Sequence, residues 1–124
     1  MARILVVDDD PDITFAISLF LKKERHDVQV AASRAEGMKA FEAFKPDLMI
    51  LDVMMEQPDD GIAMAQDLRR AGVPVPIVML TSVGKVTGMH YDRDNDLVPV
   101  DAFLEKPIRP DDLLKKVAEL LGAK

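Results

Sequence analysis

The stretch DLMILDVMM, residues 47–55, places one acidic side chain inside the most hydrophobic part of the sequence. A short, continuous apolar run that ends at a polar loop is typical of a strand buried on both faces of a parallel sheet. Asp52 stands where that strand would end. Because an isolated carboxylate is costly to bury, its position in this run suggests a function.

Apolar runs alternate with helical patterns on both sides of this strand. The other predicted strands cover residues 3–8, 28–32, 76–81 and 101–105. Asp10 and Pro11 are typical of a helix start, and Ser33 with Glu36 forms an S-x-x-E capping box that opens a second helix. Further helix boundaries are indicated by Pro46, Gly72 and Pro110. Strands that alternate with helices predict an α/β fold, a doubly wound parallel sheet covered on both faces.

The composition is that of one ordinary globular domain. The 124 residues are 48% hydrophobic and 31% charged, and 16 basic against 22 acidic side chains give a formal net charge of −6. This balance disfavours direct nucleic-acid binding, and the lack of cysteine excludes disulfides and thiolate zinc sites. No apolar run suits a membrane span or a signal peptide. We expect one cytoplasmic domain over residues 1–124 that contacts neither nucleic acid nor membrane.

Polar residues stand at the ends of four predicted strands or directly after them. They are Asp8, Asp9, Asp52, Thr81 and Lys106. Ligands of open α/β sheets bind outside the carboxyl ends of the strands, so these side chains can converge in one crevice. Each acid taken singly is equally compatible with a solvated loop or a helix cap.

Converging carboxylates repel one another. A pair ~4 Å apart costs roughly 4 kcal/mol at an effective dielectric near 20, so either one acid is protonated or a cation is bound. An oxygen-only ligand set suits Mg²⁺. A metal, a lysine and a hydroxyl around one carboxylate suit phosphoryl chemistry, with that carboxylate as the nucleophile.

The order of four motifs, ILVVDDD, ILD, MLTS and FLEKP, resembles the receiver domain of two-component response regulators. The resemblance covers the whole chain. It implies a flavodoxin-like sheet of five parallel strands in the order 2-1-3-4-5 with flanking helices. It also implies Mg²⁺ as cofactor, and a histidine kinase or phosphotransfer protein that donates a phosphoryl group to one aspartate.

Carried over residue by residue, the resemblance makes Asp52 the phosphoacceptor. It assigns direct Mg²⁺ binding to Asp9 and mainly water-mediated binding to Asp8. The backbone carbonyl of Met54 would be a further metal ligand. The same position-by-position match implies that Asp52 itself also belongs to the metal site.

The resemblance implies further roles at the ends of the last two strands. Thr81 would hydrogen-bond the phosphoryl group and Lys106 would pair with it. Phe103 matches the aromatic residue that reorients together with the threonine, although it is also compatible with a plain core aromatic. Pro107 matches the proline that follows a cis peptide bond in this family.

The chain departs from the family pattern after the acceptor. Glu56 stands where the family usually has proline, and Gly61 comes one residue later than the usual glycine, so the loop is one residue longer. Pro99 and Val100 replace the usual Gly-Ala before the fifth strand. These changes affect the expected turn and helix, and no metal or phosphate ligand. His26 and His90 lack partner acids at ligand spacing and are expected at the surface.

Three functions compete. The resemblance predicts a stand-alone receiver without an output domain, a phosphorylation-controlled switch for an unknown downstream protein, with no enzyme activity beyond its own phosphorylation and dephosphorylation. A haloacid-dehalogenase-type phosphatase also uses a strand-end aspartate and Mg²⁺, but needs a second aspartate where Met54 stands. A degenerate receiver used only as an interaction module is the third possibility, and the intact acids, threonine and lysine argue against it.

The segment SVGKVTGMHYDRDNDLVPV, residues 82–100, does not fit the alternating pattern. A helix is expected there, yet Gly84 and Gly88 would each cost ~1 kcal/mol relative to alanine. A charged DRDND cluster follows, and Pro99 prevents a helix from continuing into the next strand. We expect this fourth helix to be short or irregular and to order on phosphorylation or partner binding. The alternative is an ordinary helix that is hard to recognise in a single sequence.

Overall fold

The structure is a computed structural model that describes residues 2–53, 60–82, 100–106 and 108–122. Strands and helices alternate along most of this part of the chain. They are β1 (Arg3–Val7), α1 (Pro11–Lys23), β2 (Asp27–Ala31), α2 (Arg34–Phe44), β3 (Leu48–Asp52), α3 (Asp60–Arg70), β4 (Ile77–Ser82), β5 (Ala102–Lys106) and α4 (Pro110–Gly122). Each strand begins and ends within one residue of its predicted bounds.

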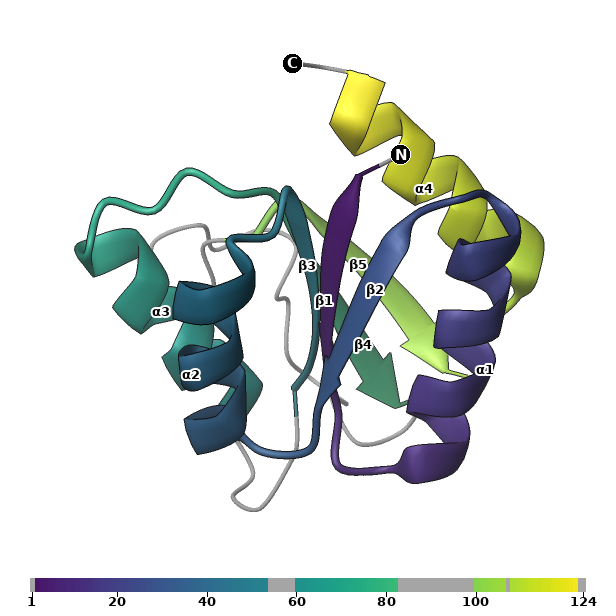
Figure 1. Cartoon of the computed structure of the whole chain (residues 1–124). Coiled ribbons are helices and arrows are strands. Elements are labelled where there is room, and N and C mark those ends of the chain that lie inside the picture. The colour runs from purple at the N-terminus through teal and green to yellow at the C-terminus, as the bar shows by residue number, and fades with distance from the viewer. Residues whose placement is uncertain (1, 54–59, 83–99, 107, 123–124) are drawn as a thin grey trace.

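The strands form one parallel sheet in the order β2-β1-β3-β4-β5 (Figure 1). This confirms the predicted strand order and fold class. β3 lies at the centre, and all of its residues are buried. The predicted short or irregular helix after β4 lies outside the described residues, and α4 is the final helix that Pro110 was expected to open.

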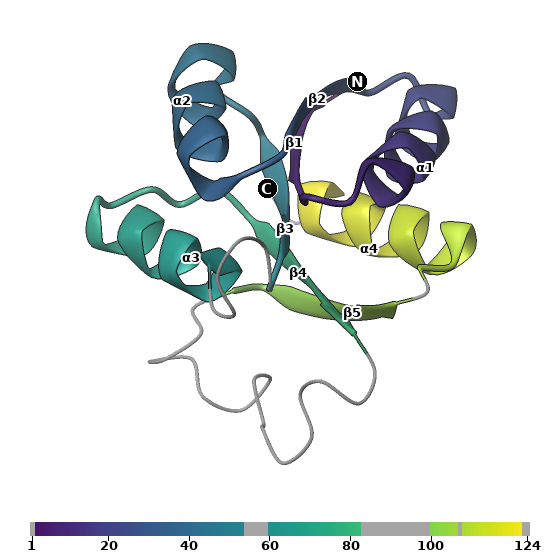
Figure 2. The same cartoon turned by 90° about the horizontal axis from the view of Figure 1, so that it is seen from below.

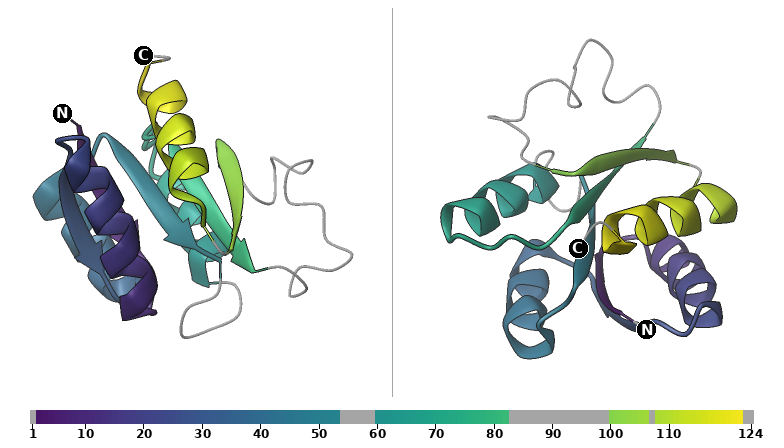
Figure 3. Two further views of the ribbon diagram at one scale, coloured as in Figure 1. Left: turned by 90° about the vertical axis from the view of Figure 1, so that its right-hand side faces the viewer. Right: turned by 90° about the horizontal axis from the view of Figure 1, so that it is seen from above.

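Helices cover both faces of the sheet, with α2 and α3 on one side and α1 and α4 on the other (Figure 2 and Figure 3). Alternate strand residues divide between the two layers, because successive side chains of a strand point to opposite faces. Leu51 lies in the core cluster that contains Met64 and Leu68 of α3. Its neighbour Ile50 packs in the cluster that contains Ile17 of α1. Because both faces of β3 are covered, every residue of the strand is buried, and this explains its continuous apolar sequence.

The helix starts follow the predicted capping signals. The Asp10 side chain accepts a hydrogen bond from Asp12 N–H at the start of α1. The Ser33 hydroxyl accepts from Glu36 N–H at 3.1 Å, and Glu36 reaches back to Ala32 N–H at 3.3 Å. Gly72 follows α3 with φ +82°, a left-handed conformation that favours glycine. Among the described helices, none is long and apolar enough to cross a membrane.

Candidate metal and phosphoacceptor site

The pairing of the two central strands brings two acidic residues to the same edge of the sheet. Val7, the last residue of β1, lies opposite Leu51 of β3. The next residue of the chain is an aspartate in both cases: Asp8 directly follows β1, and Asp52 is the last residue of β3. Both therefore lie at the carboxyl edge. Asp8 N–H donates to Ala31 O of β2 at 3.1 Å, which continues the ladder past the end of β1.

Three carboxylates converge at this edge. One oxygen from each of Asp8, Asp9 and Asp52 lies within 4.8 Å of the others. Asp8 and Asp52 are buried, with exposed fractions of 1% and 5%, whereas Asp9 is exposed. The cluster therefore has two acids held inside the fold and one that faces solvent. This is the convergence that the sequence predicts for these three residues.

The loop that carries the first two acids is ordered by its own side chains. Asp8 Oδ1 accepts a hydrogen bond from Asp10 N–H at 3.0 Å, and Asp10 Oδ1 in turn accepts from Asp12 N–H at 2.9 Å. Asp10 is thereby used as the cap of α1. The two contacts set the course of the chain between β1 and α1, and Asp9 lies between them on the exposed side.

The donor set suits a small divalent cation. Carboxylates this close repel one another, and a cation between them removes that repulsion. Mg²⁺ prefers oxygen ligands, takes one or two carboxylates and keeps several waters, so a cluster that is buried on one side and exposed at Asp9 fits it. Met54, whose carbonyl was expected to complete the site, lies outside the described residues.

The ends of β4 and β5 lie at the same edge of the sheet. Thr81 pairs in register with Glu105, and Ser82 pairs with Lys106. The backbones of Thr81 and Lys106 thus stand at the carboxyl ends of their strands, as predicted. The structure does not describe the side chains of these two residues. The roles assigned to these side chains stay predictions.

Phe103 lies opposite Met79 in the β4–β5 ladder. It is partly buried and packs against the core cluster beneath α2 and α3. This position is compatible with both readings of the sequence, a core aromatic or a residue that reorients with Thr81. Pro107 lies outside the described residues.

Gly61 contributes to the site in a way that the sequence does not reveal. It lies in the first turn of α3, and its N–H donates to Val53 O at 2.9 Å. A Cβ at this position would lie 1.9 Å from Asp52 O. The late position of this glycine marked a departure from the family pattern, but its contact with Asp52 depends on packing between separate elements. α3 forms despite that departure.

His26 lies at the other edge of the sheet, just before β2. It is partly buried rather than fully exposed, and its Nδ1 accepts a hydrogen bond from Ala2 N–H at 3.1 Å. Burial, helped by the positive N-terminus, lowers the pKa of this imidazole, against a smaller opposing effect of Glu24. His26 is therefore not brought into the carboxylate cluster.

The sequence matches the family model of the response regulator receiver domain over residues 4–118. It is 34% identical to the DNA-binding dual master transcriptional regulator RpaA of Synechocystis over 98% of this chain and 49% of that protein. It is 33% identical to the alkaline phosphatase synthesis transcriptional regulatory protein PhoP of Bacillus subtilis over 96% of this chain and 48% of that protein. The chain thus spans about half the length of these curated relatives.

Solved structures share the fold over nearly the whole chain. The chemotaxis protein CheY4 of Vibrio cholerae superimposes with a TM-score of 0.85 at 28% identity, covering 97% of this chain and 98% of that one. The receiver domain of the Francisella response regulator 1452 gives a TM-score of 0.85 at 25% identity, covering 99% and 98%.

Proposed function

Because the chain belongs to the response regulator receiver domain family of two-component systems, we propose that Asp52 accepts a phosphoryl group in a Mg²⁺-dependent reaction. The observation that carries this proposal is the convergence of Asp8, Asp9 and Asp52 within 4.8 Å at the carboxyl edge of the sheet. A carboxylate at the end of a buried central strand is held rigidly, and the surrounding apolar residues limit the access of water.

In the proposed reaction, an Asp52 carboxylate oxygen attacks the phosphorus of a phosphohistidine. A P–O bond forms, the P–N bond breaks, and the electron pair returns to the imidazole of the donor. Asp8, Asp9 and Asp52 would hold Mg²⁺, which when bound neutralises charge on the carboxylates and the phosphoryl oxygens. Thr81 and Lys106 are proposed to bind the same oxygens. The chain then carries out only its own phosphorylation and dephosphorylation.

The donor needs a surface beside Asp52 on which to dock, and α1 offers one. This helix begins two residues after Asp9, at the edge of the sheet that carries the acids (Figure 1). Phe15 and Leu19, one turn apart on α1, are large hydrophobic residues that are 68% and 42% exposed. We propose that the histidine kinase or phosphotransfer protein packs against Phe15 and Leu19 while its histidine reaches Asp52.

The phosphorylated form is proposed to act as a switch that a downstream protein recognises. Thr81 and Phe103 are the proposed switch residues, and their backbones lie on neighbouring strands, β4 and β5. The relatives RpaA and PhoP are transcriptional regulators by name. We define the downstream protein of this chain by one property, which is that it binds the phosphorylated form in preference to the unphosphorylated form.

Labelling with acetyl phosphate and Mg²⁺ tests the assignment of Asp52. Asp52→Asn should abolish the mass increase of one phosphoryl group, because it removes the nucleophile and keeps the shape of the side chain. Asp27→Asn is a matched control, since Asp27 is an exposed aspartate at the start of β2. Full labelling of Asp52→Asn, with a normal circular dichroism spectrum, would refute the proposed function.

A further inference from the structure

Gly61 lies against the backbone of the proposed acceptor. A Cβ added to Gly61 would lie 1.9 Å from Asp52 O, 2.7 Å from Asp52 C and 2.9 Å from Val53 Cα. Real Cβ atoms essentially never come within 3.0 Å of another heavy atom in this way. The contact between α3 and the end of β3 therefore exists only because residue 61 has no side chain.

Two hydrogen bonds hold the chain immediately after the acceptor. Val53 N–H donates to Leu80 O of β4 at 3.0 Å, and Val53 O accepts from Gly61 N–H at 2.9 Å. The peptide groups on both sides of Val53 are thus fixed from different directions, one by the sheet and one by α3. Asp52 is the last residue of β3, so these contacts also set the direction in which its carboxylate leaves the strand.

Other glycines of the described residues differ from Gly61 in what they contact. A Cβ on Gly37 would meet side-chain atoms, Met64 Cε at 2.9 Å and the Val7 methyl carbons at 3.0 and 3.1 Å. A Cβ on Gly72 would meet nothing within 4 Å, and glycine is favoured there because φ is +82°. Gly61 is the described glycine whose side chain would have to displace backbone, and that backbone belongs to Asp52.

We infer that Gly61 is a positioning residue for phosphorylation: its lack of a side chain lets α3 hold the Asp52 carboxylate at the right place relative to Asp8 and Asp9. A side chain at position 61 must move either α3 or the end of β3. α3 is anchored in the core by Met64, Ala65 and Leu68, which are at most 1% exposed. The displacement is therefore shared with the end of β3, where the carboxylate sits. This inference rests on the proposed role of Asp52 as acceptor.

Gly61→Ala and Gly72→Ala make a matched pair of variants on opposite ends of α3. Gly72→Ala destabilises the fold through strain at positive φ and leaves the carboxylate cluster untouched. The rate of labelling by acetyl phosphate at saturating Mg²⁺ is measured for each and divided by the folded fraction from circular dichroism. We expect Gly61→Ala to be about 10- to 100-fold slower than wild type, as misplacing a reacting group by an ångström predicts. Gly72→Ala should stay within about twofold, because its reacting groups keep their geometry.

Two further measurements separate positioning from folding. Trimethylamine N-oxide favours the compact state, so it should restore the folded fraction of both variants while Gly61→Ala remains slow. In the same samples, Mg²⁺ should bind Gly61→Ala more weakly than Gly72→Ala, because the ligand oxygens no longer converge. Wild-type rates per folded molecule in Gly61→Ala would overturn the inference, as would a failure of that variant to fold even with the osmolyte. A wild-type protein that takes no label would instead refute the proposed function itself.

Discussion

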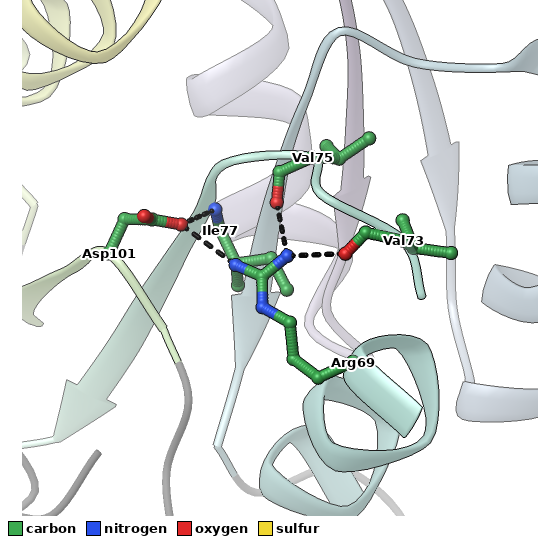
Figure 4. A network of polar contacts seen from close by, with 5 residues as sticks. All are labelled: Arg69, Val73, Val75, Ile77 and Asp101. Carbon is green, nitrogen blue, oxygen red and sulfur yellow. Dashed lines mark hydrogen bonds and ion pairs between the residues drawn. The ribbon is translucent and has the colours of Figure 1, made fainter. Parts of the chain in front are cut away.

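Arg69 of α3 and Asp101, the residue before β5, form an ion pair with an Nη2–Oδ2 distance of 2.9 Å (Figure 4). The same carboxylate oxygen accepts from Ile77 N–H at 2.8 Å, and Asp101 N–H donates to Ile77 O at 2.9 Å. Arg69 Nη1 donates to the carbonyls of Val73 and Val75, each at 2.8 Å. One guanidinium thereby ties the end of α3 to the starts of β4 and β5.

Asp101→Ala should lower the free energy of unfolding by about 2 kcal/mol, because it removes two hydrogen bonds to a charged acceptor and leaves Arg69 less well compensated. Urea denaturation measures the change. Asp101→Asn should cost less, since its amide oxygen can still accept from Ile77 N–H. Lys116→Ala breaks a more exposed pair with Glu119 on α4 and should change stability by less than about 1 kcal/mol. Equal losses in Asp101→Ala and Lys116→Ala would argue against the network.

Removing single acids should weaken Mg²⁺ binding unequally. Asp9→Ala should reduce the affinity measured by calorimetry more than Asp8→Asn, in line with the direct and water-mediated roles implied by the family. Asn at position 8 keeps an acceptor for Asp10 N–H, so the loop is preserved. Asp9→Ala should lower the affinity for Mg²⁺ about 10-fold or more, because even the loss of a group that only supports a metal ligand typically costs about 10- to 100-fold. Unchanged affinity in both variants would exclude this cluster as the metal site.

Relief of repulsion among the acids should be visible as stability. Mg²⁺ at about 100 times its dissociation constant should add ~2.7 kcal/mol by linkage, and Asp52→Asn should stabilise the metal-free protein because it removes one of three neighbouring charges. Thermal unfolding of the wild type with and without Mg²⁺ measures the first effect, and that of metal-free Asp52→Asn against metal-free wild type measures the second. Asp27→Asn, at the opposite edge of the sheet, is the control. Melting temperatures that respond to neither change would show that the carboxylates do not repel one another appreciably.

His26 should make stability depend on pH. Burial lowers its pKa below the ordinary value of 6.5, so the unfolded chain binds a proton at a higher pH than the folded protein. Its contribution to stability is therefore fully present above pH 6.5 and is lost as the pH falls from there toward the folded-state pKa. Urea denaturation between pH 7.5 and about 5 should show a shallower fall for His26→Gln than for wild type. His90→Gln, which changes the only other histidine in the sequence, is the comparison, and identical slopes for His26→Gln and wild type would contradict the assignment.

Phe15→Ala should slow phosphotransfer from a protein donor and leave labelling by acetyl phosphate unchanged. The ring is 68% exposed, so its loss should cost little stability, whereas a buried interface aromatic contributes about 2 kcal/mol or more to binding. The donor is first found by incubating the wild-type protein with each phosphorylated histidine kinase of the host. Glu42→Ala, an exposed change on α2 in the opposite helical layer, should transfer normally. Equal transfer rates for both variants would rule out this part of α1 as the docking surface.

Local patterns predicted the elements and the edge of the sheet that carries the site. The apolar run ending at Asp52 marks a strand buried on both faces, and the capping residues Asp10 and Ser33 mark helix starts, because these signals act within a few residues. The strand order and the position-by-position roles came from the family resemblance. The convergence of Asp8, Asp9 and Asp52 follows once those strands lie side by side, since their carboxyl ends share one edge.

The order of the amino acids is thus enough to predict which residues form strands, which acids stand at the strand ends and which family the chain resembles. Three contacts could not be predicted in this way. Arg69 pairs with Asp101, 32 positions further along the chain, His26 is partly buried and bonded to Ala2, and Gly61 lies against the peptide of Asp52. Capping residues and apolar runs are reliable signals because they involve residues that are close together in the sequence. Contacts between separate elements depend on how the helices pack against the sheet. A side chain such as that of Arg69 could bond to many partners, and the packing of the core selects which partner it meets.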